Sequence, residues 1–203
     1  MKVKTIDQKL IIRSLTILGL FASAFLLYYF KTHPNMMAVG GSFQKTLVSL
    51  GAFGPLLFIL LQMVQVIYPI IPGGMTAIIG HIIFGPLYGF IYNFVGIFIG
   101  SLLAFGLARR YGNGFAKAFV SEETYDKYVS YLDRNDGKFF EKFLAAAFIL
   151  PGFPDDFLCV VAGLSKMTWK KFIVIFLISK PATLYLYTII GYQGLNAVLQ
   201  IFQ

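Results

Sequence analysis

Two adjacent carboxylates, Asp155 and Asp156, follow Pro154 inside a largely apolar part of the chain. If this part lies within a membrane, the burial of two ionisable side chains is costly and usually serves a function. In a transport cavity the carboxylates would carry protons or pair with a cation. They would also stabilise the start of a short helix, because acids favour the positive end of the helix dipole. The two roles are compatible.

Lys180 lies about nine residues into the last long apolar run, or about 13 Å from its start at 1.5 Å per residue. We expect its ammonium group to pair with Asp155 or Asp156, or to meet a phosphate. The alternative is that the side chain extends to a membrane interface. Pro181 follows directly and predicts a break in the helix, which favours the functional role.

Gly73 and Gly74 follow Pro72 at another break in the apolar sequence. Unpaired backbone N–H groups at a helix start can bind an anion, and a lipid phosphate would suit such a site. The alternative is that these glycines only permit the turn and a close approach of helices. Arg109 ends a further apolar run, where it would attract anionic headgroups or simply anchor the topology.

The composition indicates a membrane protein. Of the 203 residues, 58% are hydrophobic and 13% are charged, whereas about 25% of residues are charged in a typical soluble domain. Lipid must therefore solvate much of the surface. The net charge is +8, and the basic residues flank apolar runs. This pattern indicates topology signals and contact with anionic lipids rather than nucleic-acid binding.

The apolar residues fall into separate stretches, which cover residues 12–30, 53–71, 75–84, 86–107, 139–150, 157–161 and 172–190. A helix needs about 20 apolar residues to span a bilayer, so the stretches 75–84 and 139–150 are too short to cross alone. The stretch 12–30 is longer than the apolar part of a signal peptide, about 7–15 residues. It is interpreted as an uncleaved first membrane helix.

Two similar breaks adjoin the short stretches, Pro69-Ile-Ile-Pro72-Gly73-Gly74 and Pro151-Gly-Phe-Pro154-Asp155-Asp156. Each P-x-x-P forces non-helical backbone, because proline lacks an N–H group and disfavours helix in the preceding residue. Such backbone is tolerated at membrane depth only inside protein or beside a wet cavity. Short, broken helices at matching places in two halves are typical of inverted-repeat transporters. The sequence therefore predicts an all-α polytopic membrane protein with two re-entrant helical hairpins in an inverted repeat.

The basic residues orient the predicted hairpins. With a cytoplasmic N-terminus, 14 of the 17 basic residues lie on the cytoplasmic side, in agreement with the positive-inside rule. We expect a multi-pass protein of the plasma membrane. Residues 1–52 would form an N-terminal tail, a first membrane helix and an outer loop. Residues 53–203 would form the membrane domain, with repeats at 53–111 and 139–191, a polar interfacial linker at 112–138 and a tail at 192–203.

The linker is expected to be partly helical. Ser121 and the two glutamates after it predict a capped helix start, and the Asn-Asp-Gly sequence at 135–137 predicts its end. Tyr125 and Tyr128 fall on one face at helical spacing. The helix would lie at the cytoplasmic membrane interface or pack on the protein.

Two motifs resemble those of a known family. The first runs from Ile71-Pro-Gly-Gly through Phe84-Gly-Pro-Leu-Tyr-Gly89 to Ala104-Phe-Gly-Leu-Ala-Arg109-Arg-Tyr-Gly112, and the second comprises Leu150-Pro-Gly-Phe-Pro-Asp-Asp156 and Ala162-Gly163. Across residues 69–191 the chain resembles the DedA-like, SNARE-associated Golgi protein family, which carries the VTT domain. The resemblance implies re-entrant hairpins and the movement of lipids, as polyprenyl-phosphate carriers in bacteria or phospholipids in eukaryotes.

The chain departs from the family pattern at two places. Many bacterial members carry an acid in or near the first hairpin, but here no acid occurs between Asp7 and Glu122, and Gln62 and Gln65 occupy that limb. Many members also carry an arginine just before the second P-x-x-P, where this chain has only apolar residues at 148–150. Mechanisms that depend on those two charges do not transfer to this chain.

We expect a lipid transporter or scramblase that moves polyprenyl phosphates or phospholipid headgroups through a cavity between the hairpins. The expected binding residues are Asp155, Asp156, Lys180, Gly73, Gly74, Pro72, Pro154 and Arg109. One alternative is a proton- or ion-coupled transporter of small solutes, and another is a scaffold for membrane homeostasis. No enzyme motif is present, His81 has no second metal ligand at a suitable spacing, and no catalytic residue, metal or cofactor is expected.

Overall fold

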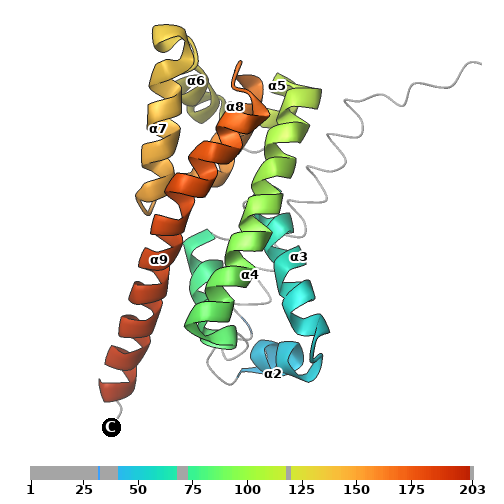
Figure 1. The fold of residues 1–203 in the computed structure, drawn as a ribbon, viewed down its shortest axis with the longest axis vertical. Coiled ribbons are helices and arrows are strands. Elements are labelled where there is room, and N and C mark those ends of the chain that lie inside the picture. Colours follow the sequence, from blue (N-terminus) through green and yellow to red (C-terminus); the bar gives the residue numbers. More distant parts are fainter. Residues whose placement is uncertain (1–31, 33–40, 68–72, 118–119, 202–203) are drawn as a thin grey trace, which may run out of the picture.

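The structure is a computed structural model that describes residues 32, 41–67, 73–117 and 120–201. Throughout these residues the regular elements are helices (Figure 1): α2 (Ser42–Ser49), α3 (Phe53–Ile67), α4 (Gly73–Tyr111), α5 (Asn113–Ala116), α6 (Glu122–Val129), η2 (Arg134–Gly137), α7 (Lys138–Ile149), α8 (Asp155–Leu164) and α9 (Trp169–Ile201). The predicted all-α class is confirmed. The predicted first membrane helix at 12–30 lies outside the described residues.

Two helical stretches are long and apolar enough to cross a membrane. They are Thr76–Tyr111 in α4, which includes a break at Gly85, and Trp169–Ile189 in α9, and α3 is a shorter apolar helix. Large apolar side chains on their outer faces, such as Leu87, Ile91 and Ile178, are exposed. An apolar outer surface of this kind is matched to lipid.

α4 consists of two arms that meet at Gly85. This residue has φ 79° and ψ 174°, and Pro86 follows it. The positive φ favours glycine, and the proline cannot continue the hydrogen bonding of the first arm. A Cβ at Gly89 would lie 2.6 Å from the Gly80 carbonyl oxygen, so the arms pack side by side (Figure 1). The predicted short stretch 75–84 and the longer stretch 86–107 are therefore separate helices.

α7 and α8 form a second broken pair, and the connection between them contains the second P-x-x-P. α7 begins at the end of the molecule where α5 and α6 lie, whereas α3 begins at the opposite end beside α2 (Figure 1). α8 is almost fully buried from Asp156 to Gly163. A Cβ at Gly163 would lie 2.3 Å from the Phe105 carbonyl oxygen, so α8 packs directly on the backbone of α4.

α9 is one continuous helix through Pro181, so the predicted break at this residue is wrong. Proline removes one backbone hydrogen bond and disturbs the preceding turn. Neighbouring helices make this tolerable in membrane helices, and α9 packs against both α4 and α7. Aromatic rings fill these contacts: Phe172 lies 4.5 Å from Phe105 of α4, and Phe176 lies 5.4 Å from Phe148 of α7, measured between ring centroids.

The linker helix α6 packs on the protein. The Ser121 hydroxyl accepts the Thr124 N–H at 3.3 Å, which confirms the predicted cap. The helix ends at Val129, earlier than predicted, and the short η2 follows. Tyr125 and Tyr128 are 5% and 8% exposed and belong to the core. Their contacts with protein, rather than lipid, account for the apolar face of this helix.

Charged residues are concentrated at one end of the molecule. Among the described residues, every charged side chain except Lys45, Asp155, Asp156 and Lys180 belongs to residues 109–142 or 166–171. These residues lie in or beside α5, α6, η2, the starts of α7 and α9, and the ends of α4 and α8. We call this region the polar end. Of the four exceptions, Asp155, Asp156 and Lys180 lie deep among apolar helices.

Candidate functional site

A buried ion pair joins α8 to α9. Lys180 Nζ of α9 contacts Asp155 Oδ2 in the first turn of α8. The Lys180 and Asp155 side chains are 6% and 17% exposed, so both charges are largely withdrawn from solvent. The predicted pairing of Lys180 with one of the two aspartates is therefore present, and the partner is Asp155.

Two prolines explain why Asp155 lies at a helix start. α7 ends because its C-cap, Leu150, precedes Pro151 and adopts the extended conformation with φ −90° and ψ 130°. Pro154 is the N-cap of α8, and its carbonyl accepts the Leu158 N–H at 3.0 Å. The carboxylate of Asp155 thus lies in the first turn, where the helix dipole favours negative charge. The helix-start role predicted for the aspartates coexists with the ion pair.

α9 also satisfies a polar group at the end of α7. The Thr183 hydroxyl donates to the Phe148 carbonyl, which has no helical partner because α7 ends at Ile149. On the same side of α9, Lys180 Nζ lies 5.6 Å from the centroid of the Phe148 ring, a distance at which a cation is attracted to the ring face. These two contacts hold the end of α7 against α9 and fix the position of Lys180.

Asp156 connects α8 to α3 and α4. Its Oδ2 accepts Gln65 Nε2 at 3.3 Å, and Gln65 Oε1 accepts the Thr76 hydroxyl at 2.6 Å. Asp156 and Gln65 are 9% and 8% exposed. Thr76 belongs to the first turn of α4, so these bonds join the helix start after the first predicted break to the helix start after the second. Asp155, Asp156, Lys180, Gln65 and Thr76 form what we call the charged cluster.

A second buried group contains no ion pair, and we call it the neutral cluster. Gln62 Nε2 donates to Asn93 Oδ1, and Asn93 Nδ2 donates to the Ala77 carbonyl at 2.8 Å. His81 Nδ1 lies 2.6 Å from the same carbonyl, and Nε2 lies 2.5 Å from the Thr188 hydroxyl oxygen. With its proton on Nδ1, a neutral imidazole donates to the Ala77 carbonyl and accepts the Thr188 hydroxyl at Nε2. The same hydroxyl lies 2.9 Å from the Leu184 carbonyl, so its single hydrogen is shared between two acceptors. The cluster joins α3, both arms of α4 and α9.

Of the two glycines after the first break, Gly74 has a packing role. Gly73 begins α4, and a Cβ at Gly74 would lie 2.6 Å from a ring carbon of Tyr187 in α9. A side chain at this position would collide with the ring, so Gly74 permits the close approach of helices that was one of its two predicted roles. Pro72 lies outside the described residues.

Arg109 lies apart from the charged cluster. Its Nε donates to the Gly163 carbonyl at 3.2 Å, and one terminal nitrogen donates to the Ser165 carbonyl at 2.8 Å. Both acceptors belong to the end of α8, where helical carbonyls lack partners and a cation is favoured. The guanidinium group also lies 4.4 Å from the Phe105 ring centroid. Arg109 thus fastens α8 to α4, and these contacts account for its position.

Several members of the two clusters were not among the predicted site residues: Gln62, Gln65, Thr76, His81, Asn93 and Thr188. The two glutamines and Asn93 had a visible signal, because each is a polar residue within an otherwise apolar run. Thr76 and Thr188 gave none, since a threonine can satisfy its hydroxyl on its own helix.

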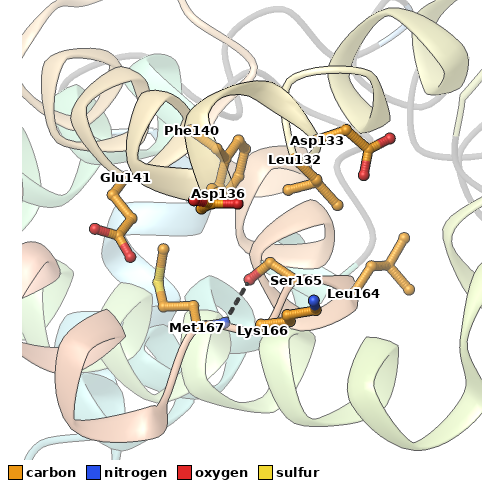
Figure 2. Close-up of a pocket in the computed structure, with 10 residues that line it drawn as sticks. Leu132, Asp133, Asp136, Phe140, Glu141, Leu164, Ser165, Lys166 and Met167 are labelled. Atoms are coloured by element: carbon orange, nitrogen blue, oxygen red, sulfur yellow. Dashed lines mark hydrogen bonds between the residues drawn. The ribbon is translucent and has the colours of Figure 1, made fainter.

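A pocket of about 390 Å³ lies at the polar end, away from both clusters. It is lined by Leu132, Asp133, Asp136, Gly137, Phe140, Glu141, Leu164, Ser165, Lys166 and Met167 (Figure 2). None of the predicted site residues belongs to it. Within the described part of the chain, no group of three or more potential metal-binding side chains is close enough to hold an ion.

Apolar outer faces, two helical stretches long and apolar enough to cross a membrane, and a buried ion pair between α8 and α9 are the features of a helical membrane protein. The VTT domain matches residues 71–193, a range that contains the charged cluster except Gln65. The chain belongs to the DedA/SNARE-associated Golgi protein family, which this domain defines. Neither the curated proteins nor the solved structures include a match to the chain.

Proposed function

We propose that the protein moves lipid headgroups across the membrane, and that the charged cluster binds the phosphate. In this proposal α3 with the first arm of α4, and α7 with α8, are two re-entrant hairpins of an inverted repeat. The hairpins enter from opposite faces of a plasma membrane, and each contributes residues to the charged cluster: Gln65 and Thr76 from the first, Asp155 and Asp156 from the second. The chain crosses the membrane several times with a cytoplasmic N-terminus.

The buried Lys180–Asp155 pair is the observation that carries the proposal. Placing two charges in an apolar interior has a desolvation penalty that mutual attraction often fails to offset. An apolar pair of similar volume would hold α8 and α9 together at least as well. The presence of the ion pair is therefore better explained by a role in binding than by stability, as is usual for ionisable groups at membrane depth.

The geometry suggests how a phosphate would enter. Asp155 is the more exposed partner of the pair, and the connection that precedes it, Pro151 to Pro154, is exposed. A lipid phosphate that approaches this connection would replace the Asp155 carboxylate on Lys180, one anion exchanging for another. The displaced carboxylate would then be available to a proton or a cation. The N–H groups at Gly73 and Gly74 would provide a further contact for the phosphate.

The test is lipid translocation in proteoliposomes that contain the purified protein, with fluorescent phospholipid and polyprenyl phosphate as probes. We expect wild type to translocate at least one of the two lipids. Asp155→Asn should reduce the rate at least tenfold, about 1.4 kcal/mol, because a neutral amide cannot return to Lys180 and displace the bound phosphate. Glu122→Gln is the matched control, because Glu122 belongs to an exposed ion pair with Lys117 at 3.5 Å. Translocation of neither lipid by the folded wild-type protein would contradict the proposal.

A second candidate function is the proton-coupled transport of a small solute. The observation that favours it is Asp156, whose buried carboxylate has the neutral Gln65 rather than a cation as its side-chain partner. Such a carboxylate can bind and release a proton without breaking an ion pair. Uptake of protons driven by a solute, without lipid movement and abolished by Asp156→Asn, would favour this function over lipid transport.

A further inference from the structure

The pocket at the polar end has an apolar floor and a charged rim. Phe140 and Met167 are 1% and 4% exposed and form the floor with Leu132 and Leu164. Asp133, Asp136 and Glu141 lie on one side of the rim, and Lys166 lies on the other (Figure 2). A pocket with these properties suits a small amphiphilic ligand that carries both signs of charge.

The charges on the rim are only partly satisfied within the protein. Glu141 pairs with Lys171 at 2.5 Å. Asp133, Asp136 and Lys166 form no ion pair with any residue that the structure describes. The rim therefore offers two carboxylates for a cationic group and one ammonium for an anionic group, with the apolar floor between them.

The position of the pocket indicates the source of the ligand. Its lining extends to Met167, two residues before α9 begins at Trp169, and Trp169 is 44% exposed. Exposed tryptophan at the end of a spanning helix is typical of the membrane–water interface. Lipid headgroups occupy this depth. The volume, about 390 Å³, is at the lower end of the range for small-molecule sites, about 300–1,000 Å³, and suits a headgroup better than a whole lipid.

We infer that this pocket binds the headgroup of an ammonium-bearing phospholipid, with the ammonium at Asp133 and Asp136, the phosphate at Lys166 and the glycerol region over Phe140 and Met167. A primary ammonium donates three hydrogen bonds, and hydrogen bonds to charged acceptors are the strong ones. A glycerol headgroup offers no positive charge to the acids. The pocket should therefore distinguish ethanolamine from glycerol headgroups.

This inference does not rest on the proposed transport function, because the pocket and the charged cluster share no residue. A protein that binds ethanolamine lipids here and moves none of them would support the pocket and contradict the transport proposal. A protein that moves lipids but does not bind ethanolamine lipids at this pocket would contradict the pocket and support the transport proposal.

The experiment measures lipid binding to the full chain, purified in detergent, by native mass spectrometry. The probes are phosphatidylethanolamine, phosphatidylglycerol with the same acyl chains, and soluble phosphoethanolamine. We expect phosphatidylethanolamine to bind at least tenfold more tightly than phosphatidylglycerol. In the variant with Asp133→Asn and Asp136→Asn, this preference should fall about tenfold, the loss expected for one charged hydrogen bond.

Two controls keep the test sharp. Glu123→Gln removes an exposed acid of α6 that does not line the pocket, and it should leave the preference unchanged. Lys166→Gln should weaken both lipids, because both carry a phosphate. Soluble phosphoethanolamine that binds as tightly as the lipid, with the same dependence on the two aspartates, supports the pocket chemistry and assigns the ligand to the free molecule. Equal binding of the two lipids to wild type would overturn the inference.

Discussion

The charged cluster and the neutral cluster solve the same packing problem in different ways. Both place polar side chains between broken helices, and both include a glutamine of α3, Gln65 in one and Gln62 in the other. The neutral cluster satisfies its members with amides, a histidine, a carbonyl and a hydroxyl. The charged cluster achieves a similar connection with three ionisable groups, at a much larger desolvation penalty.

This difference separates a structural role from a binding role. A hydrogen-bonded neutral group in an apolar interior joins helices at little net penalty. If joining helices were the only requirement, a second neutral cluster would have served equally well at Asp155 and Lys180. The presence of charged rather than neutral groups at these two positions therefore favours the charged cluster as the binding site.

The largest loss of stability is expected from a substitution in the charged cluster. Lys180→Met removes one partner of the pair and leaves Asp155 as an uncompensated buried charge. Loss of one partner from a buried pair typically lowers the free energy of unfolding by about 3–5 kcal/mol. The measurement is the thermal unfolding midpoint of the purified protein in detergent. A midpoint equal to that of wild type would mean that water already reaches Asp155.

In the neutral cluster, Asn93→Leu should have a smaller effect on stability. It leaves the Gln62 amide without its partner, whereas the Ala77 carbonyl keeps its contact with His81 Nδ1. One unsatisfied buried group costs about 1–3 kcal/mol. We expect the unfolding midpoint to fall while translocation per folded molecule stays the same. If translocation is lost from a variant that remains folded, the division between the two clusters is wrong.

Asp156→Asn tests the charged cluster without breaking the ion pair. Asparagine retains an oxygen that can accept the Gln65 amide, so we expect the free energy of unfolding to change by less than about 1 kcal/mol. Proton-coupled activity should be lost, since the amide cannot carry the proton. Full retention of such activity would remove Asp156 from the mechanism.

The smallest effect on stability and translocation is expected from a substitution outside both clusters. Ser121→Ala removes the N-cap of α6 and should lower the free energy of unfolding by about 1 kcal/mol. Translocation should not change, because α6 belongs to the polar end. This variant calibrates the stability assay against which the two clusters are compared.

Much of the fold could be predicted from the sequence because prolines and glycines act locally. Pro151 and Pro154 end one helix and begin the next, and Gly85 separates the two arms of α4. The helix break predicted at Pro181 was wrong because the conformation there depends on contacts that are not local. The proline's local effect is real, but α9 stays helical through this residue and packs against helices that are distant in the sequence.

The site was predicted in part. The residues with formal charge could be recognised, because charge in an apolar run is rare and Lys180 had few possible partners. The hydrogen-bonded members could not be assigned to it. Gln65 meets Asp156, which is 91 residues away, and no local spacing rule relates the two. The role of Arg109 at the end of α8 was likewise set by packing between distant segments.

The most direct test of the central claim is translocation by the double variant with Asp155→Leu and Lys180→Met. Replacing both members of a buried pair with apolar residues is often neutral or stabilising, so this variant should fold as well as wild type, as the unfolding midpoint will show. If the ion pair binds lipid phosphate, the folded variant will not translocate phospholipid or polyprenyl phosphate in proteoliposomes. Translocation at the wild-type rate would contradict this account and leave the ion pair with a structural role.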